Sequence, residues 1–328
     1  MNHYTTRREF LQAVAGLSGL ALTAGVLAAA TNGPESSSPV DSLRKLPPLS
    51  FSTLGCPDWT FPAILDFATK NNYQGIEVRG IQRQMDLPQC PEFNSAEHIA
   101  ATLRQMQDHR LKFVDLGSSC ELHYTDPAVR KKNLDEGRRF IDLAHALGCP
   151  NVRVFPNRLP KDQDRDATID LIIKGLLELG DHARGSGVTV LMESHGEVVQ
   201  TELLHHIMQG AEHPNTGMVW DIYNMWSVTK EPPASVYARL KKYIRHSHIK
   251  DGKSSGGHLE NGIVVDAKED YLLLGKGESP IFEAIDLLSK GGYTGFYSFE
   301  WEKLWHPEIA EPELALADYP QAMQRHFQ

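Results

Sequence analysis

From residue 49 onward, short runs rich in β-branched and aromatic residues alternate with longer amphipathic stretches. The short runs end in polar residues, and the longer stretches repeat their apolar residues at helical spacing. Eight short runs are the expected strands: 49–55, 75–80, 111–117, 151–156, 188–194, 217–221, 244–250 and 295–302. Eight strands that alternate with helices at this spacing predict parallel βα units closed into a single (β/α)8 TIM barrel.

Helix boundaries are marked by capping residues. Asp126 and Ser279 each precede a proline, an arrangement that favours a side-chain cap followed by proline at the first helical position. Gly148 and Gly291 lie where two helices are expected to stop. An open, doubly wound sheet is the alternative architecture, but no glycine-rich phosphate loop follows the first strand.

Strand alternation assigns residues to two faces. In the last expected strand, Tyr297, Phe299 and Trp301 share one face, and Ser298 and Glu300 share the other. The apolar face suits the surrounding helices, and the polar face suits the barrel interior. Polar residues near the carboxyl end of a barrel strand are the usual catalytic positions.

The amino terminus has the pattern of an export signal. Arg7 and Arg8 precede an apolar run at 13–30 that ends in small residues. This order predicts a twin-arginine signal over residues 1–30 and a periplasmic or exported protein. The alternative is an uncleaved signal that stays as a membrane anchor, and membrane contact is expected only through such a segment.

A segment rich in proline and serine separates this signal from the barrel. Residues 31–48 show no apolar period, so they are expected to be a linker. The barrel is then expected over residues 49–328, a normal length for one such domain.

The amino-acid composition limits which partners this protein is expected to bind. The formal net charge is −9 although the first 30 residues contribute net positive charge, so the expected barrel is acidic. An acidic surface argues against nucleic acid as a partner, because phosphates require a basic footprint. The spacings of the four cysteines match no zinc motif, and free buried thiols are expected. They are Cys56, Cys90, Cys120 and Cys149.

Candidate metal ligands lie at the ends of the last four expected strands. These residues are Glu193, Asp221, His248 and Glu300. Buried carboxylates are costly unless they are paired or bind a cation, and one cation would compensate all three. Three oxygen donors and one nitrogen donor favour one divalent ion, Mn²⁺ first and Mg²⁺ or Co²⁺ next, over a structural zinc.

Two of these four residues have a neighbour in the sequence that could be the ligand in their place. His246 shares the interior face with His248 but lies about 6–7 Å further from the strand's end. We therefore expect His248 as the ligand and His246 as a hydrogen-bonded residue one layer below. Glu300 is preferred over Glu302 because strand alternation is regular through residue 300, whereas 302 falls in the following loop.

The chain resembles a known enzyme family in these segments. The pieces LMESHG, VWDIYN, HSHIKD, LLGKGESPIFEAI and GGYTGFYSFEWEK occur in an order similar to that of the sugar isomerase and epimerase family with a xylose-isomerase-like barrel. The resemblance covers the chain from residue 49 on. It implies that Glu193, Asp221, His248 and Glu300 bind a divalent metal, and that the two glutamates also transfer protons. One position departs from the family: Asn224 stands where many members have histidine, which bears on the substrate more than on the metal.

The expected chemistry is isomerisation or epimerisation of a sugar or keto-sugar by proton transfer beside a carbonyl, through an enediolate. Arg153, His195 and Asn224 are the candidates for binding hydroxyl groups. The alternative for Arg153 is an interior salt bridge with Glu77. Lys250 shares the interior face but could simply be solvated. A homo-oligomer remains open.

Three other functions are alternatives to this chemistry. The same site could act on a 3-keto-glycoside as a lyase and expel the glycosidic group by β-elimination. A non-enzymatic sugar-binding module belongs to a different class. Apurinic endonucleases share the barrel, but they require more histidine ligands and a basic face.

Overall fold

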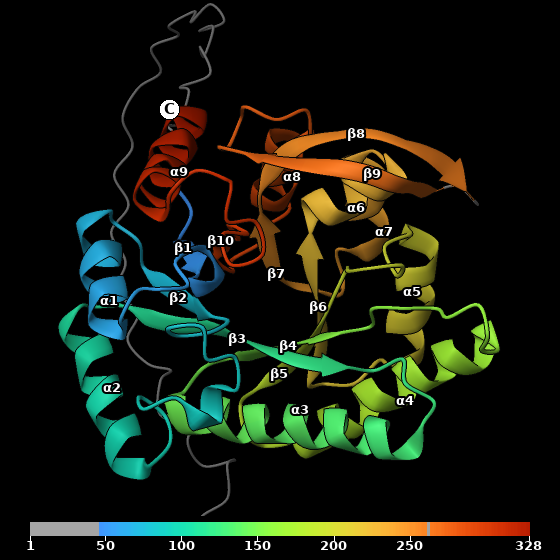
Figure 1. Cartoon of the computed structure of the whole chain (residues 1–328), viewed down its shortest axis with the longest axis horizontal. Coiled ribbons are helices and arrows are strands. Elements are labelled where there is room, and N and C mark those ends of the chain that lie inside the picture. Colours follow the sequence, from blue (N-terminus) through green and yellow to red (C-terminus); the bar gives the residue numbers. More distant parts are fainter. Residues whose placement is uncertain (1–45, 261–262) are drawn as a thin grey trace, which may run out of the picture. The chain divides into compact units, whose positions relative to one another are not determined.

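Eight parallel strands close into a barrel surrounded by helices (Figure 1). The structure is a computed structural model that describes residues 46–260 and 263–328. The expected signal at 1–30, and the expected linker except its last three residues, lie outside the described residues. The TIM-barrel prediction is confirmed.

The barrel strands follow each other in sequence order around the barrel, and β10 pairs with β1 to close it. They are β1 (Leu49–Ser52), β2 (Gly75–Val78), β3 (Lys112–Glu121), β4 (Asn151–Phe155), β5 (Thr189–Glu193), β6 (Thr216–Asp221), β7 (Ile244–Ile249) and β10 (Tyr297–Phe299). Each lies within or overlaps one of the eight expected runs. The shared direction brings all their carboxyl ends to one mouth of the barrel.

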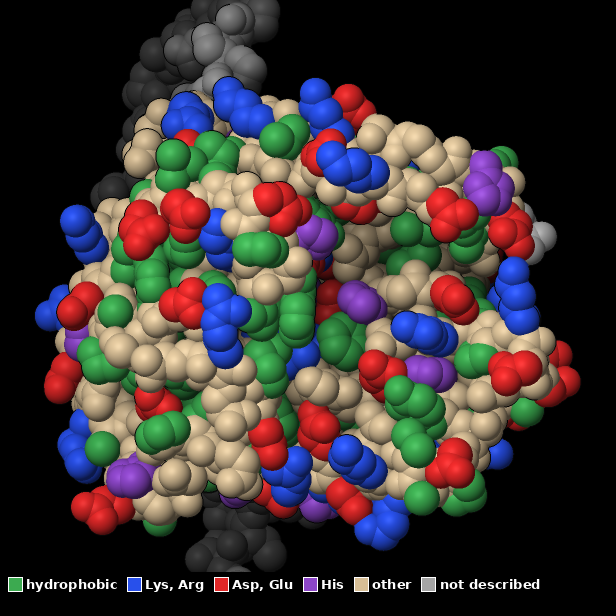
Figure 2. Space-filling model, in the orientation of Figure 1, with side chains coloured by type: hydrophobic (Ala, Val, Ile, Leu, Met, Phe, Trp, Pro, Cys, Tyr) green, Lys and Arg blue, Asp and Glu red, His purple; other side chains and the backbone are tan. Residues whose placement is uncertain are grey.

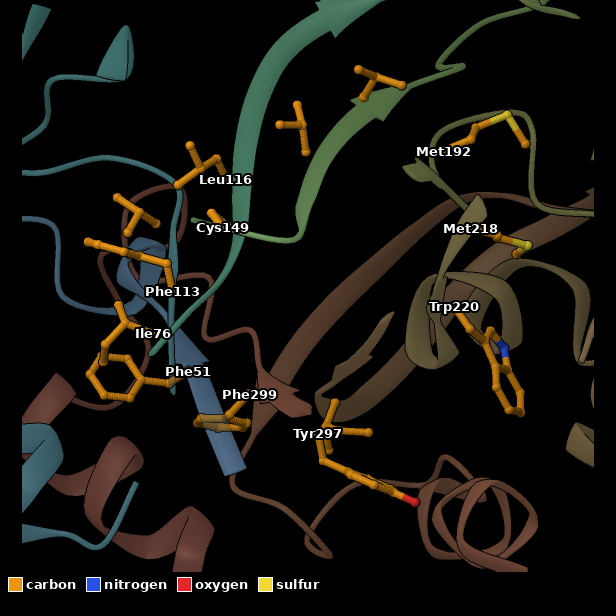
Figure 3. Close-up of a cluster of buried hydrophobic side chains, with 14 of the residues drawn as sticks. Phe51, Ile76, Phe113, Leu116, Cys149, Met192, Met218, Trp220, Tyr297 and Phe299 are labelled. Atoms are coloured by element: carbon orange, nitrogen blue, oxygen red, sulfur yellow. The ribbon is translucent and has the colours of Figure 1, made fainter. Parts of the chain in front are cut away.

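Helices surround the strands. They are α1 (Phe61–Lys70), α2 (Ala96–Asp108), α3 (Pro127–Leu147), α4 (Arg165–His182), α5 (Thr201–Gly210), α6 (Ile222–Thr229), α7 (Pro233–Leu240), α8 (Ile281–Lys290) and α9 (Pro312–Phe327), with short 3-10 turns at Thr53–Gly55 and Leu87–Gln89. Outward-facing strand residues such as Phe51, Ile76 and Phe299 form the buried layer against them (Figure 3). The apolar face of each strand is therefore the helix-facing one, as strand alternation predicted.

One predicted helix cap is confirmed and one is wrong. The Asp126 side chain accepts hydrogen bonds from two backbone N–H groups at the start of α3, and Gly148 ends that helix at φ 63°. Ser279 does not cap α8, which begins at Ile281. Its hydroxyl instead donates to Asp251 Oδ1 at 2.6 Å, because this buried carboxylate lies within reach and takes the hydroxyl away from the helix.

A two-stranded hairpin follows β7 and was not predicted. It consists of β8 (Asp251–Glu260) and β9 (Ile263–Leu272), which pair antiparallel. Most of its residues are exposed or half-buried, so its sequence carries no clear apolar alternation. The hairpin packs against α6, where the Tyr223 hydroxyl donates to Glu269. Within residues 46–260 and 263–328, no helix is both long and apolar enough to cross a membrane.

Candidate metal centre at the barrel mouth

The four predicted ligands meet at one point. Each of Glu193, Asp221, His248 and Glu300 offers an atom within 4.8 Å of the other three, and all four side chains are buried. The Nδ1 atom of His248 lies 3.3 Å from Glu193 Oε1, 3.3 Å from Glu300 Oε2 and 3.6 Å from Asp221 Oδ2. The structure thus brings together the residues that the strand pattern selected.

Strand register explains this convergence. Asp221 of β6 is paired with His248 of β7, and Ser298 of β10 is paired with the same histidine. Glu193 ends β5, and Glu300 follows β10 directly. Because neighbouring parallel strands end at the same height, their terminal polar residues face one another across the mouth.

The donor set fits a divalent cation. Ligands bound at about 2.1 Å lie about 3.0 Å apart in an octahedral shell and about 3.4 Å apart in a tetrahedral one, which matches the His248–carboxylate separations. Neither Glu193 Oε2 nor Asp221 Oδ2 makes a well-aligned hydrogen bond within the described residues, although charged groups lie nearby. Each of these oxygens lies within 3.0 Å of a cationic side chain, Arg153 for Glu193 and Lys250 for Asp221, so the case for a metal rests on the donor set and its spacing.

A second buried cluster lies directly beneath the four ligands. Glu77 Oε2 is 3.1 Å from His248 Nε2 and 2.8 Å from His246 Nε2, and it accepts a hydrogen bond from Ser298 at 2.9 Å. His246 is therefore hydrogen-bonded one layer below His248, as predicted. Glu77 fixes which nitrogen of His248 faces the other ligands, a role that the sequence analysis missed. Its position on the interior face of β2 was the only available signal.

The charge of His248 and the charge of Glu77 depend on each other. Burial by itself lowers the pKa of His248, but the carboxylates of Glu300, Glu77 and Glu193 outweigh burial and hold that pKa well above its usual range. Burial by itself raises the pKa of Glu77, and the two histidines outweigh it and hold that pKa well below its usual range. A bound cation would compete with the His248 proton for the same three carboxylates.

Arg153 lies beside the ligands and not where one alternative placed it. Its Nε atom is 3.0 Å from Glu193 Oε2, and its Nη1 donates to the Ser118 carbonyl at 2.7 Å. The alternative of a salt bridge with Glu77 is wrong, because Arg153 pairs with Glu193 on the adjacent strand, and Glu77 contacts His246 and His248 instead. The guanidinium also lies 3.8 Å from the centre of the Phe155 ring. Arg153 thus holds Glu193 from the side opposite to His248.

Lys250 is part of the site. Its side chain is buried, and Nζ lies 2.8 Å from Asp221 Oδ2, 2.6 Å from Glu300 Oε2 and 2.7 Å from Glu302 Oε1. The interpretation of Lys250 as a solvated residue is therefore wrong. Burial by itself lowers its pKa, but the three carboxylates outweigh burial and raise it well above the usual range. Glu302 contacts Lys250 and is not one of the four clustered ligands.

The other two candidates for binding substrate lie around the ligands. His195 is half-buried beyond β5, with Nδ1 2.8 Å from Asn157 Oδ1 and its ring centre 4.5 Å from that of Phe155. Asn224 lies in the first turn of α6, where its backbone N–H donates to Asp221 Oδ1 at 2.8 Å. Asn224 therefore helps to orient a ligand through its backbone, and its partly exposed side chain keeps its amide for other contacts.

The mouth opens to the surface as a hollow. In the space-filling view, acidic side chains lie at the floor of this hollow near the centre of the face, and a histidine lies at its edge (Figure 2).

The family model described as "Xylose isomerase-like TIM barrel" matches residues 65–324. The chain belongs to this family. No curated protein is similar enough in sequence to count as a match.

Solved structures share the fold at low sequence identity. The IolI protein with a bound zinc atom is 19% identical with a TM-score of 0.69, and the match covers 85% of this chain and 98% of that one. The 3-keto-D-glucoside 4-epimerase YcjR from E. coli is 13% identical with a TM-score of 0.66, covering 85% and 99%. A xylose isomerase-like TIM barrel protein from Mycobacterium smegmatis, in complex with magnesium, is 19% identical with a TM-score of 0.63, covering 85% and 96%. At these identities the likeness concerns the fold.

Proposed function

We propose that this protein is a metal-dependent sugar isomerase or epimerase that moves a proton beside a carbonyl group. One observation carries the proposal: three buried carboxylates and the Nδ1 atom of His248 converge within 4.8 Å at the open mouth of the barrel. Family membership and the epimerase among the structural neighbours support a sugar as the substrate class.

The residues divide the work as follows. Glu193, Asp221, His248 and Glu300 hold one divalent cation, which polarises the carbonyl and adjacent hydroxyl oxygens of the sugar when bound. Glu193 and Glu300 come from β5 and from the end of β10, so the two carboxylates approach the substrate from different sides. One removes the proton next to the carbonyl, which leaves an enediolate, and the other returns a proton. Return to the same carbon gives an epimer, and return to the neighbouring carbon gives an aldose–ketose isomer.

The residues around the four ligands orient the two glutamates and the substrate. Arg153 holds Glu193 at 3.0 Å, and Lys250 holds Glu300 at 2.6 Å, so each base is fixed by a cation on its outer side. We propose that His195 and the Asn224 amide bind hydroxyl groups of the substrate. We propose Mn²⁺ as the metal, with Mg²⁺ or Co²⁺ as substitutes, from the preference of oxygen-rich sites. The zinc and the magnesium in the two structural neighbours belong to those proteins.

The second candidate is a 3-keto-glycoside lyase that uses the same four ligands. After the same proton abstraction, the electron pair expels the glycosidic oxygen and leaves an unsaturated keto-sugar. The neighbour named 3-keto-D-glucoside 4-epimerase favours keto-glycosides as a substrate class for this barrel. A non-enzymatic sugar-binding module is the third candidate.

We further propose export through the twin-arginine route. Its support is the sequence pattern of Arg7 and Arg8 before an apolar run. That route carries folded proteins, so a metal could be loaded before export. Fractionation of cells that express the full chain, with an Arg7→Lys, Arg8→Lys double variant as control, tests this proposal.

The enzyme proposals are separated by one experiment. Metal-loaded protein is incubated in D₂O with free ketoses and with 3-keto-glycosides, and the products are followed by NMR. Deuterium at one carbon without cleavage supports the isomerase or epimerase, and loss of the aglycone supports the lyase. If no sugar exchanges a proton although the protein holds its metal, both enzyme proposals fail and the binding module remains.

A further inference from the structure

The β8–β9 hairpin reaches from one side of the barrel mouth to another. It leaves the chain directly after β7, and its end residue Glu260 pairs with Lys161 at 3.5 Å. Lys161 lies in the loop between β4 and α4. The hairpin thus joins the loops that follow β7 and β4, and between these two strands in the barrel order lie β6 and β5, whose ends carry Asp221 and Glu193. In Figure 1 the hairpin is drawn across α6.

A cleft of about 480 Å³ lies between this hairpin and the loops that follow β4 and β5. Ile263 and Val265 form its hairpin wall, and Leu159 and Pro160 form the facing wall. Polar groups, among them Gln163 and Arg165, lie around these apolar walls. The volume is within the range of small-molecule sites.

The cleft is linked to the metal centre through the same two loops. The Leu159 N–H donates to Glu197 Oε2 at 2.7 Å, and the Glu197 N–H donates to the Asn157 carbonyl at 2.8 Å. The Asn157 side chain lies 2.8 Å from His195, whose ring packs on Phe155. The Arg153 guanidinium also lies against the Phe155 ring and pairs with Glu193, so a continuous chain of contacts joins the loops that line the cleft to the ligands.

We propose that this cleft binds a second sugar ring of the substrate, so that the enzyme acts on a disaccharide-sized glycoside and not on a free monosaccharide. This inference rests on the proposed function, since it extends the same site. A pyranose ring has an apolar C–H face and a rim of hydroxyl groups. The apolar walls suit the face, and the amide and guanidinium groups suit the rim. A free monosaccharide at the ligands would leave this cleft empty.

Strand alternation in the hairpin provides a matched control. Ile263 and Val265 line the cleft, whereas Val264 lies between them on the same strand and does not. Val264 is half-buried, as Ile263 and Val265 are. Leu159 supplies an independent test from the facing wall, outside the hairpin.

The test measures binding to Mn²⁺-loaded full-length protein by calorimetry, with glucose and the glucose disaccharides cellobiose, maltose and trehalose as probes. We expect at least one disaccharide to bind about tenfold or more tightly than glucose, since each added apolar contact in a pocket contributes about 10-fold or more. The Ile263→Ser, Val265→Ser double variant and the Leu159→Ser variant should each lose this difference while glucose affinity stays the same. Val264→Ser should keep it, and thermal unfolding confirms that the variants are folded.

The proposal is overturned if no disaccharide binds more tightly than glucose, or if both cleft variants keep the wild-type preference. Binding is read without turnover, so this outcome is separate from the D₂O experiment. Proton exchange into a monosaccharide with no disaccharide preference would support the proposed enzyme and contradict the proposal that the cleft binds a second sugar ring. A disaccharide preference without proton exchange would support the cleft and contradict the proposed enzyme.

Discussion

The Nε2 atom of His248 lies 3.1 Å from Oε2 of Glu77, in a pair with no access to solvent. This contact leaves Nδ1 as the nitrogen that faces Glu193, Asp221 and Glu300. Two strands on different parts of the barrel, β2 and β7, thus set the orientation of one imidazole.

Replacing Glu77 should weaken metal binding without removing a ligand. In Glu77→Gln the neutral amide no longer favours the proton on His248 Nε2, so we expect metal affinity to fall by about 10–100-fold. Titration of Mn²⁺ into the chelator-treated protein measures this. Ser298→Ala is the control, because it removes only a hydroxyl that donates to Glu77. Unchanged affinity in the glutamine variant would mean that Glu77 does not orient His248.

Asp221→Ala should remove metal and activity together. The substitution deletes one oxygen donor and leaves Glu193 and Glu300 without a shared cation. Mass spectrometry of the purified protein measures the metal content. Glu302→Gln serves as the control, since Glu302 contacts Lys250 and lies outside the four-ligand cluster. If the alanine variant held a full equivalent of metal, Asp221 would not be a ligand.

Glu193→Gln and Glu300→Gln should separate binding from proton transfer. Each keeps one oxygen donor but removes the base, so metal binding should weaken modestly while turnover falls about 10²–10⁴-fold. With a substrate labelled at the abstracted position, one variant should block label loss in the forward direction and the other in reverse. Near-normal turnover of both variants at saturating metal would show that the carboxylates act only as ligands. His195 would then be the next residue to test.

Asp115 should make stability depend on pH. It is fully buried on β3, neither of its carboxylate oxygens has a hydrogen-bond partner among the described residues, and burial together with Glu77 raises its pKa to about 7. The folded state therefore binds this proton more tightly than the unfolded state. Its contribution to the free energy of unfolding is full below about pH 4 and is lost as pH rises to about 7.

Asp115→Asn should remove that dependence. We expect the variant to match the wild type near pH 4 and to be more stable at pH 8, by no more than about 4 kcal/mol. Urea unfolding at both pH values measures the difference. Asp58→Asn is an exposed control whose carboxylate is paired with Arg83, and it should give no gain at pH 8. An Asp115→Asn variant less stable than the wild type at pH 8 would contradict the expectation.

The sequence by itself determined the barrel and the four clustered residues. Strand runs such as YSFEW alternate strictly, so each strand shows which of its residues face inward. The parallel repeat then places strand ends at one mouth, so Glu193, Asp221, His248 and Glu300 could be assigned there before any coordinates. The rise per residue along a strand was enough to choose His248 over His246 as the ligand, because it places His248 nearer the carboxyl end of the strand.

Tertiary structure decided which interior charges pair. Alternation placed Glu77, Arg153 and Lys250 inside, but it could not select partners, since partners depend on which strands are neighbours and on side-chain reach. Arg153 pairs with Glu193 on the adjacent strand, Glu77 reaches across the barrel to two histidines, and Lys250 turns inward to three carboxylates. The sequence pattern also did not predict the β8–β9 hairpin. Its strands are stabilised by pairing and by contact with α6, and a mostly exposed hairpin needs no regular apolar pattern.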